Sequence, residues 1–173
     1  MRNGVLRYKS CEMINPELCE GADINIKGET GREWAWTEPT LIELSNGDVV
    51  MLMRVDGSGC LWRSDSENGG KTWSKAVPTD IPNPGNKPKL LALSGGRIGL
   101  IHTPNPIVGR LNVRYLLALW ISHDDMRTWP EKHILTDFPG YYCYPDGFVE
   151  DNRIYFTIEI NRHEILLFVC DDV

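Results

Sequence analysis

The sequence lacks the features that mark membrane-spanning, exported and nucleic-acid-binding chains. None of its apolar runs approaches the length of a membrane span, and no apolar core follows Met1 as it would in an export signal. Its net charge of −6 argues against a general basic surface for nucleic acids. We therefore expect no membrane segment and no nucleic-acid partner. The compartment stays open, and a secreted or periplasmic parent protein is compatible with the sequence.

The sequence also lacks a recognisable cysteine motif and a helical periodicity. The five cysteines form no CxxC motif and no Cys/His ligand spacing, so the sequence predicts neither a disulfide framework nor a metal site. Cys60 and Cys170 lie in apolar, strand-like runs, and we expect both to be small core residues. Because almost no helical periodicity is present, the pattern favours an all-β fold.

A repeated box is the most informative feature that is present. The stretch Ser66–Trp73 reads Ser-x-Asn-x-Gly-x-Thr-Trp, and Ser122–Trp129 is a looser copy with Asp in place of Asn. Asn68 and Asp124 are suited to accept hydrogen bonds from backbone amides within a turn. Repeats at this spacing are typical of architectures such as β-propellers.

Three longer segments align with one another around these boxes. Each reads as a residue before proline, a short strand, a tight turn and an apolar strand, and they span 38–54, 87–103 and 144–159. Asn46-Gly47 and Gly95-Gly96 favour tight hairpin turns because these residues accept positive φ. A further strand follows in each unit, at 59–64, 115–122 and 164–170.

These units predict a partial β-propeller of about three four-stranded antiparallel blades. In the first two units the box turns the chain into a short fourth strand. We expect the partial propeller to occupy residues 35–173, with blades at about 35–80, 84–136 and 141–173. Residues 1–34 read as an irregular segment in which 4–9 is a candidate outer strand of a preceding blade.

The prolines predict where one end of the propeller gathers its side chains. Proline removes a ladder donor, so Pro39, Pro88 and Pro145 belong at strand starts or on edge strands, which line the channel of a propeller. Glu38, Lys87 and Tyr144 then occupy equivalent places at one rim. Side chains that end the adjacent strands return to the same rim; they are Arg54, Thr103 and Glu159.

At these residues the chain resembles the C-terminal half of the sialidase (neuraminidase) superfamily of six-bladed propellers with Asp boxes. Glu38 matches the glutamate that activates the nucleophile, and Tyr144 matches the tyrosine nucleophile. Arg54 and Arg114 match two arginines of the triad that binds the substrate carboxylate. Glu159 falls where family members often carry a further acidic residue or tyrosine. The resemblance covers roughly residues 35–173.

The resemblance implies a retaining exo-sialidase chemistry that releases terminal sialic acids without a cofactor. The anomeric carbon of a sialic acid carries a carboxylate, so a neutral phenol with a neighbouring base avoids the repulsion that a carboxylate nucleophile would meet. The family's acid/base Asp and first triad arginine lie upstream of the matched region, and residues 1–34 offer no convincing replacement. The second box places Met126 where the family has Gly, which requires a different or strained turn.

Several readings stay open at the level of sequence. Arg110 competes with Arg114 for the arginine role, and Tyr141 and Tyr142 compete with Tyr144 as aromatic rim or core residues. A degenerate segment that binds acidic glycans without cleaving them is the alternative function, and a purely structural fragment is a third. A partial propeller exposes blade faces, so we expect a homo-oligomer or association with a complementary half.

Overall fold

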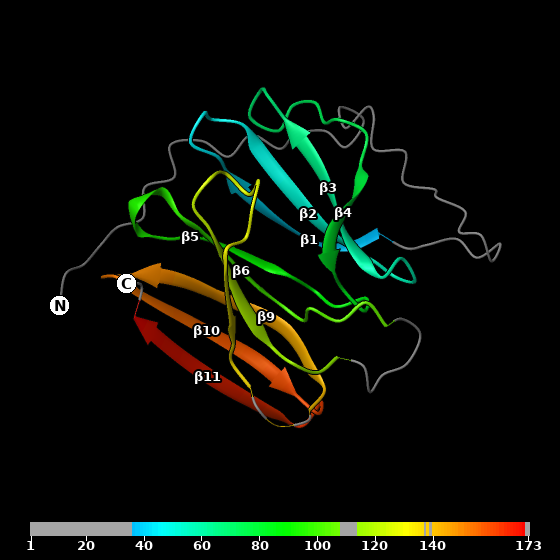
Figure 1. Ribbon diagram of the computed structural model, residues 1–173, viewed down its shortest axis with the longest axis vertical. Helices are drawn as coiled ribbons and strands as arrows, with labels where there is room; N and C mark the ends of the chain where they lie inside the picture. The colour runs from blue at the N-terminus through cyan, green and yellow to red at the C-terminus, as the bar shows by residue number, and fades with distance from the viewer. Residues whose placement is uncertain (1–35, 108–113, 137, 139, 172–173) are drawn as a thin grey trace.

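A computed structural model describes residues 36–107, 114–136, 138 and 140–171, and shows three antiparallel sheets in succession along the chain (Figure 1). The predicted segment 1–34, its candidate strand at 4–9, and Arg110 lie outside these residues. Within them, the only helical element is a single 3₁₀ turn at Ser94–Gly96, and no helix is long and apolar enough to cross a membrane. The chain is therefore all-β, as the sequence predicts.

Each sheet is a meander in which consecutive strands pair. The first sheet contains β1 (Trp36–Glu43), β2 (Val49–Val55), β3 (Cys60–Ser66) and β4 (Val77–Pro82). The second contains β5 (Lys89–Ala92), β6 (Ile98–His102), β7 (Ala118–Ser122) and β8 (Glu131–Ile134). The third contains β9 (Tyr142–Glu150), β10 (Arg153–Ile160) and β11 (Glu164–Asp171). The first strands of the sheets contact one another in the order β1, β5, β9, as the inner strands of propeller blades do.

One boundary within the predicted blades needs correction. The first two sheets have the four strands that the sequence predicts, and the third has three described strands. The third strand of the second unit begins at Ala118 instead of 115, since Tyr115 and Leu116 are exposed and Leu116 has a positive φ of 63°. The predicted hairpin glycines do take positive φ, with 88° at Gly47 and 65° at Gly95.

The two Ser/Thr/Trp boxes form nearly the same hydrogen-bonded turn. Asn68 Oδ1 accepts the Thr72 amide at 2.9 Å, and Asp124 Oδ1 accepts the Thr128 amide at 2.9 Å. The predicted role of Asn68 and Asp124 is therefore confirmed. These bonds, led by that from the Thr128 side chain, hold the pKa of Asp124 down to about 2.

Met126 shows how the second box tolerates the loss of glycine. Its amide donates to Ser122 Oγ at 2.9 Å, as Gly70 donates to Ser66 Oγ in the first box. Met126 has a φ of 64°, so the turn keeps its shape and carries the strain expected for a side chain there. The Met126 side chain is buried in the core between the first two sheets, and this packing offsets the strain.

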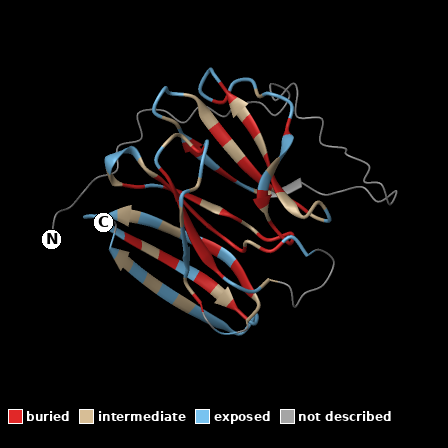
Figure 2. Ribbon diagram, in the orientation of Figure 1, coloured by how far each residue is buried: buried red, intermediate tan, exposed pale blue. Residues whose placement is uncertain are grey.

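Apolar side chains fill the two spaces between successive sheets. One cluster joins the first and second sheets around Leu52, Leu61 and Leu100, and a second joins the second and third sheets around Ile101, Phe156 and Ile158. The middle sheet is covered on both faces, so every residue of β6 and β7 is buried, whereas β11 alternates between exposed and half-buried residues (Figure 2).

Two of the described cysteines lie at the margins of these clusters instead of in the core, where the sequence places them. Cys60 and Cys170 are only half-buried, at the margins of apolar clusters, while Cys143 is fully buried. All three are free thiols. Desolvation by burial raises the pKa of each above its usual value, which keeps the thiols protonated at neutral pH.

Candidate functional site

Two of the three proline motifs displace a side chain from an edge strand. The β1–β2 register shifts between Thr37 and Thr40, and the β9–β10 register shifts between Thr157 and Glu159. The residues set aside are the pairs Glu38-Pro39 and Tyr144-Pro145. Glu38 and Tyr144 have left-handed backbones, with φ of 51° and 55°, which neither residue type favours. The same local distortion therefore presents a carboxylate on the first sheet and a phenol on the third.

The middle proline motif differs from the other two. Lys87 precedes Pro88 just outside β5, and the β5–β6 register is unbroken. Unlike Glu38 and Tyr144, Lys87 does not have a positive φ. Its amide donates to Asn86 Oδ1 at 3.1 Å. The sequence predicts equivalent places for Glu38, Lys87 and Tyr144. In backbone geometry, only Glu38 and Tyr144 are equivalent.

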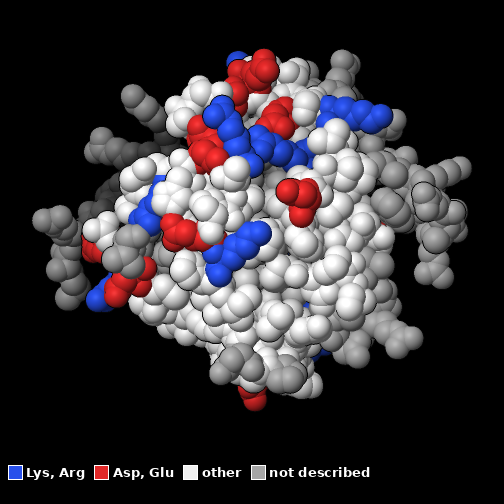
Figure 3. Space-filling model, viewed as in Figure 1, with Lys and Arg blue, Asp and Glu red and all other residues white. Residues whose placement is uncertain are grey.

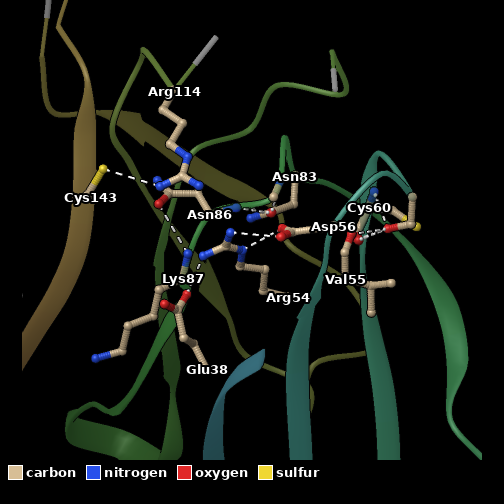
Figure 4. Close-up of polar contacts among 12 residues, drawn as sticks. Glu38, Arg54, Val55, Asp56, Cys60, Asn83, Asn86, Lys87, Arg114 and Cys143 are labelled. Carbon is tan, nitrogen blue, oxygen red and sulfur yellow. Dashed lines mark hydrogen bonds and ion pairs between the residues drawn. The ribbon is translucent and has the colours of Figure 1, made fainter. Parts of the chain in front are cut away.

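Arg54, at the end of β2, is held by two carboxylates. Its Nη1 lies 2.7 Å from Glu38 Oε2, and its Nε and Nη2 lie 2.7 and 3.0 Å from the two oxygens of Asp56 (Figure 4). Burial alone would lower the pKa of Arg54, but the bonds from Asp56 and Glu38 outweigh it and leave that pKa above its usual value. Asp56 was not identified by sequence reasoning, although the i, i+2 spacing from Arg54 places it on the same side of an extended chain.

The loop between the first two sheets packs against this ion pair and joins all three sheets. Asn83–Asn86 is buried throughout, and Gly85 approaches so closely that a Cβ there would meet Asp56 Oδ1 at 2.7 Å. The Asn86 Nδ2 group donates to Thr103 Oγ1 at 2.8 Å and to the Tyr142 carbonyl at 2.7 Å. Asn86 therefore ties the end of β6 to the start of β9. The sequence gives no signal for this role beyond the Gly-Asn pair.

Exposure separates the three neighbouring tyrosines. Tyr142 is fully buried and its hydroxyl donates to the Phe138 carbonyl at 2.8 Å, so it is a core residue. Tyr141 is half-buried beneath two arginines. Tyr144 is 45% exposed, and its hydroxyl makes no hydrogen bond with any residue that the structure describes. Of the three, Tyr144 has the phenol that an incoming ligand reaches most easily.

Arg114 lies in the segment before β7 and approaches the start of β9. Its Nη1 is 3.4 Å from the Cys143 sulfur, and its Cζ is 5.0 Å from the centre of the Tyr141 ring. Its carbonyl accepts the Tyr142 amide at 2.9 Å, which fixes the backbone of Arg114 against the third sheet. In Figure 4, Arg54 from β2 and Arg114 from the segment before β7 both point toward the loop that carries Asn86.

The remaining rim residue, Glu159, lies at the end of β10 in register with Cys143, and is half-buried. The structure thus brings Glu38 into contact with Arg54, and Arg114 and Glu159 beside the start of β9. Among the described residues, no hydrogen bond links Glu38 to Tyr144. Glu38 Oε2 instead accepts a hydrogen bond from Arg54 Nη1. Within the same residues, no group of three or more His, Cys, Asp or Glu side chains is arranged to hold a metal ion.

Comparison with known families gives one match over most of the chain. Residues 22–156 match the family model described as BNR repeat-like domain. No curated protein sequence matches the chain.

Solved structures with a similar fold are sialidases and related propeller enzymes. The leech intramolecular trans-sialidase has 20% identity and a TM-score of 0.63, and the Trypanosoma rangeli sialidase has 22% identity and a TM-score of 0.59. Each of these matches covers 78% of this chain but only 23% of the other. The Penicillium chrysogenum alpha-L-arabinanase has 16% identity and a TM-score of 0.57, with 79% of this chain and 46% of that chain covered. At these identities the likeness concerns the fold, and the chain spans about a quarter of the length of the sialidases that it matches.

Proposed function

Because this chain belongs to the BNR repeat-like family, within the sialidase superfamily of propellers, we propose that it forms part of a sialidase-type glycoside hydrolase acting on terminal sialic acids. One observation carries the proposal. Two bulges that contain a proline, on separate sheets, present Glu38 and Tyr144 with the same left-handed backbone φ. Strain of this kind persists where the surrounding structure imposes it, and it is concentrated at functional sites.

In the proposed reaction Tyr144 is the nucleophile and Glu38 its base. The phenol oxygen forms a bond to the anomeric carbon while its proton passes to a carboxylate oxygen of Glu38, and the bond to the leaving oxygen breaks. Free tyrosine has a pKa of about 10, so attack near neutral pH needs this base. Oε2 of Glu38 is bonded to Arg54, and Oε1, which has no hydrogen bond to a described residue, is the oxygen that takes the proton.

Arg54 and Arg114 are the proposed partners of the sugar carboxylate, and Glu159 and Lys87 complete the rim. The guanidinium fork suits paired hydrogen bonds to a carboxylate. Arg54 already holds Glu38 and Asp56, so a ligand would add to a cation that is neutralised on two sides. The acid that protonates the leaving oxygen is not assigned to a described residue. We propose that it lies in the part of a sialidase domain that this chain does not match.

Hydrolysis of an aryl sialoside tests this proposal. Such a substrate has a good leaving group, so the reaction depends little on the missing acid. We expect Tyr144→Phe to reduce turnover to background and Glu38→Gln to reduce it by about 100-fold, a typical contribution of a general base. Tyr115→Phe, which alters another exposed tyrosine, is the matched control and should leave turnover unchanged. Turnover that survives Tyr144→Phe would refute the assignment.

A non-catalytic module that binds acidic glycans is the second candidate. The observation in its favour is the bond between Glu38 and Arg54, which engages the proposed base in an ion pair. Calorimetry with N-acetylneuraminic acid separates the two candidates. Binding that is unaffected by Tyr144→Phe, with no sialoside turnover by the parent chain, would support the module; no binding by the folded chain would exclude it.

We also propose that the chain associates with a second copy or a complementary propeller half. The outward face of the third sheet exposes Phe148, Ile165, Leu167 and Val169, each by at least half of its surface. In Figure 3, charged side chains gather over the part of the molecule where Figure 1 places the first sheet, and they are sparse over the part with the third. Apolar surface of this extent usually meets a partner. Light scattering at micromolar concentration should show a dimer or larger assembly, and a clean monomer would contradict the prediction.

A further inference from the structure

The three sheets end in outer strands that differ in how they meet solvent. β4, β8 and β11 are the last strands of the first, second and third sheets, and in each case no described strand pairs with the free side. A free strand edge presents unpaired backbone N–H and C=O groups, to which another chain can add a strand. Soluble proteins protect such edges with short strands, proline or charged side chains.

The outer strands of the first two sheets carry these protections. β4 contains Pro78 and Pro82, which have no backbone donor, and the exposed Asp80. β8 has only four residues, and three of them are Glu131, Lys132 and His133. Neither edge is therefore suited to receive another strand.

β11 has none of these protections. It has eight residues without a proline, its charged residues, Glu164 and Asp171, stand at its two ends, and every residue between them is apolar. In Figure 1, β11 lies at the margin of the molecule. No residue of β11 is fully buried, whereas the adjacent β10 is buried at every second position. An apolar edge of this length favours the addition of a strand.

The side chains of β11 that face the core are incompletely covered. Leu166, Phe168 and Cys170 pack against the cluster between the second and third sheets but are only half-buried. The Phe168 ring stacks on the ring of Phe156, with centroids 4.8 Å apart, and Phe156 itself is 1% exposed. A strand added beside β11 would place side chains against the open flank of this row and complete its burial.

A second copy of the same strand fits this edge in an antiparallel arrangement. Two copies related by a twofold axis must pair residues of the same sheet face, since a shift by one residue turns every side chain to the other face. When Leu167 lies opposite Leu167 of the second copy, Ile165 lies opposite Val169, and Leu166 lies opposite Phe168. Every pairing in this central part of the strand is then apolar.

The same register also separates like charges. Asp171 of one copy lies opposite His163 of the other, and Glu164 lies opposite the uncharged Cys170. The β10–β11 turn holds His163 at this position, because the His163 amide donates to the Ile160 carbonyl at 3.2 Å. The two ends of the paired strands are therefore complementary in charge.

The neighbouring registers that keep the sheet faces matched are less favourable. Centring the pair on Phe168 places the Asp171 carboxylate opposite the apolar Ile165. Centring it on Leu166 places Glu164 opposite Phe168 and shortens the overlap. A carboxylate held against an apolar side chain loses hydration without gaining a partner. Charge and apolar pattern therefore select the register centred on Leu167.

We propose that β11 pairs antiparallel with β11 of a second copy, centred on Leu167, and joins the three strands of each third sheet into one continuous sheet. The inference rests on the proposed association of the chain, for which it selects a second copy as the partner and the sheet edge as the contact. Like most twofold interfaces, it uses the same surface on both copies. It makes no use of Glu38 or Tyr144, so it is independent of the proposed activity.

Sedimentation velocity over a concentration series tests the surface with two matched variants. Leu167 and Phe148 are 65% and 56% exposed and lie on the same outward face, but Phe148 is on β9, which β10 separates from the free edge. We expect Leu167→Lys to raise the dimer dissociation constant by about 100-fold, because two leucines leave the contact and two lysines oppose each other. Phe148→Lys should leave the dissociation constant unchanged. Both variants should keep the parent's melting temperature, since both sites are exposed.

An exchange of charged residues tests the register. At pH 7, His163→Asp places a carboxylate opposite Asp171 in two symmetric contacts, and we expect about fivefold weaker association. Adding Asp171→His to this variant exchanges the two residues and should restore the parent affinity. Recovery requires that positions 163 and 171 oppose each other, which the neighbouring registers do not provide. A double variant that stays as weak as His163→Asp would overturn the register.

The outcomes separate the edge contact from other modes of association. Equal weakening by Leu167→Lys and Phe148→Lys would assign the contact to the outward face of the third sheet. A dimer that Leu167→Lys leaves intact would place the contact elsewhere on the chain. Either result overturns the pairing of β11 and leaves the proposed association standing. A monomeric parent chain, whose β11 is then left to a strand of a complementary propeller half, would overturn both.

Discussion

Arg54 and Arg162 lie in opposite electrostatic settings. Arg54 is largely buried, with 13% of its side chain exposed, and both edges of its guanidinium bind carboxylates. Arg162 lies on an exposed turn against an aromatic ring and has no carboxylate partner among the described residues. An arginine that carboxylates satisfy inside the fold holds elements in place, whereas an exposed arginine against a tyrosine contributes less to stability. The predictions below test that division.

The largest effect is expected where the buried arginine is removed. Arg54→Ala leaves Glu38 and Asp56 without their cation beside the buried loop at 83–86. We expect a loss of about 3 kcal/mol in the free energy of unfolding, at the lower end for breaking a buried ion pair because both carboxylates keep some exposure. Urea denaturation measures it. Arg63→Ala removes the more exposed pair with Asp65 and should cost less than about 1 kcal/mol. Equal effects would contradict the division.

The next prediction concerns the buried side-chain amide of Asn86, which joins the end of β6 to the start of β9. Asn86→Ala removes the donors that satisfy the Tyr142 carbonyl and Thr103 hydroxyl. We expect a loss of about 2 kcal/mol, since buried acceptors are left without partners. Asn105→Ala, at another buried asparagine that does not join the sheets through these two bonds, is a comparison for generic effects. If Asn86→Ala left both stability and sialoside turnover unchanged, the joining role would be wrong.

A buried base without a carboxylate partner predicts a pH dependence. His102 is fully buried against Trp120, and neither ring nitrogen has a well-formed hydrogen bond with a described residue. Desolvation lowers its pKa to about 3, against a weaker opposing contact with the Pro82 backbone. The unfolded chain binds this proton below about pH 6.5 and the native chain only near pH 3, so stability is complete above pH 6.5 and declines as pH falls between these values.

This histidine should cost about 2 kcal/mol of stability between pH 6.5 and pH 4.5. Urea denaturation at several pH values measures the slope. His102→Gln should flatten it in that window, because Asp124, with its pKa near 2, loses stability only at lower pH. A slope that His102→Gln does not change would show that another group is responsible.

The smallest effect is a gain. Arg162→Gly relieves the left-handed strain at the β10–β11 turn, and we expect the free energy of unfolding to rise by about 0.5 to 1 kcal/mol. Asn152→Gly makes the same change in the matching turn, where the residue already tolerates the conformation, and should gain less. A marked loss of stability in Arg162→Gly would mean that this arginine supports the fold, like Arg54.

Residue patterns predicted most of the fold and a part of the site. Asn46-Gly47 and Gly95-Gly96 marked hairpins because few residues accept positive φ, and the boxes at Ser66 and Ser122 marked turns because their side chains bond locally. The residues set aside before Pro39 and Pro145 were also predicted, since proline is found at sheet edges and bulges, whereas Lys87 before Pro88 lies outside its strand. Such local rules transfer directly from sequence to structure.

Long-range contacts explain what the sequence did not reveal. Asp56 matters because Gly85 packs against it, and Asn86 because Thr103 and Tyr142 converge on it from other sheets. Arg162 resembles an ordinary turn residue until the ring of Tyr141 is placed beside it. None of these neighbours is close in sequence, so no spacing rule identifies them.

Covalent labelling of Tyr144 tests the central claim most directly. A sialosyl fluoride that carries a second fluorine beside the anomeric carbon loses fluoride without an acid and forms a slowly hydrolysed intermediate, so the assay does not depend on the unassigned acid. The account predicts that mass spectrometry finds one sugar on Tyr144, and that Glu38→Gln slows labelling by about 100-fold. A chain that stays unlabelled, or a sugar found on Tyr141 or Tyr142, would contradict it.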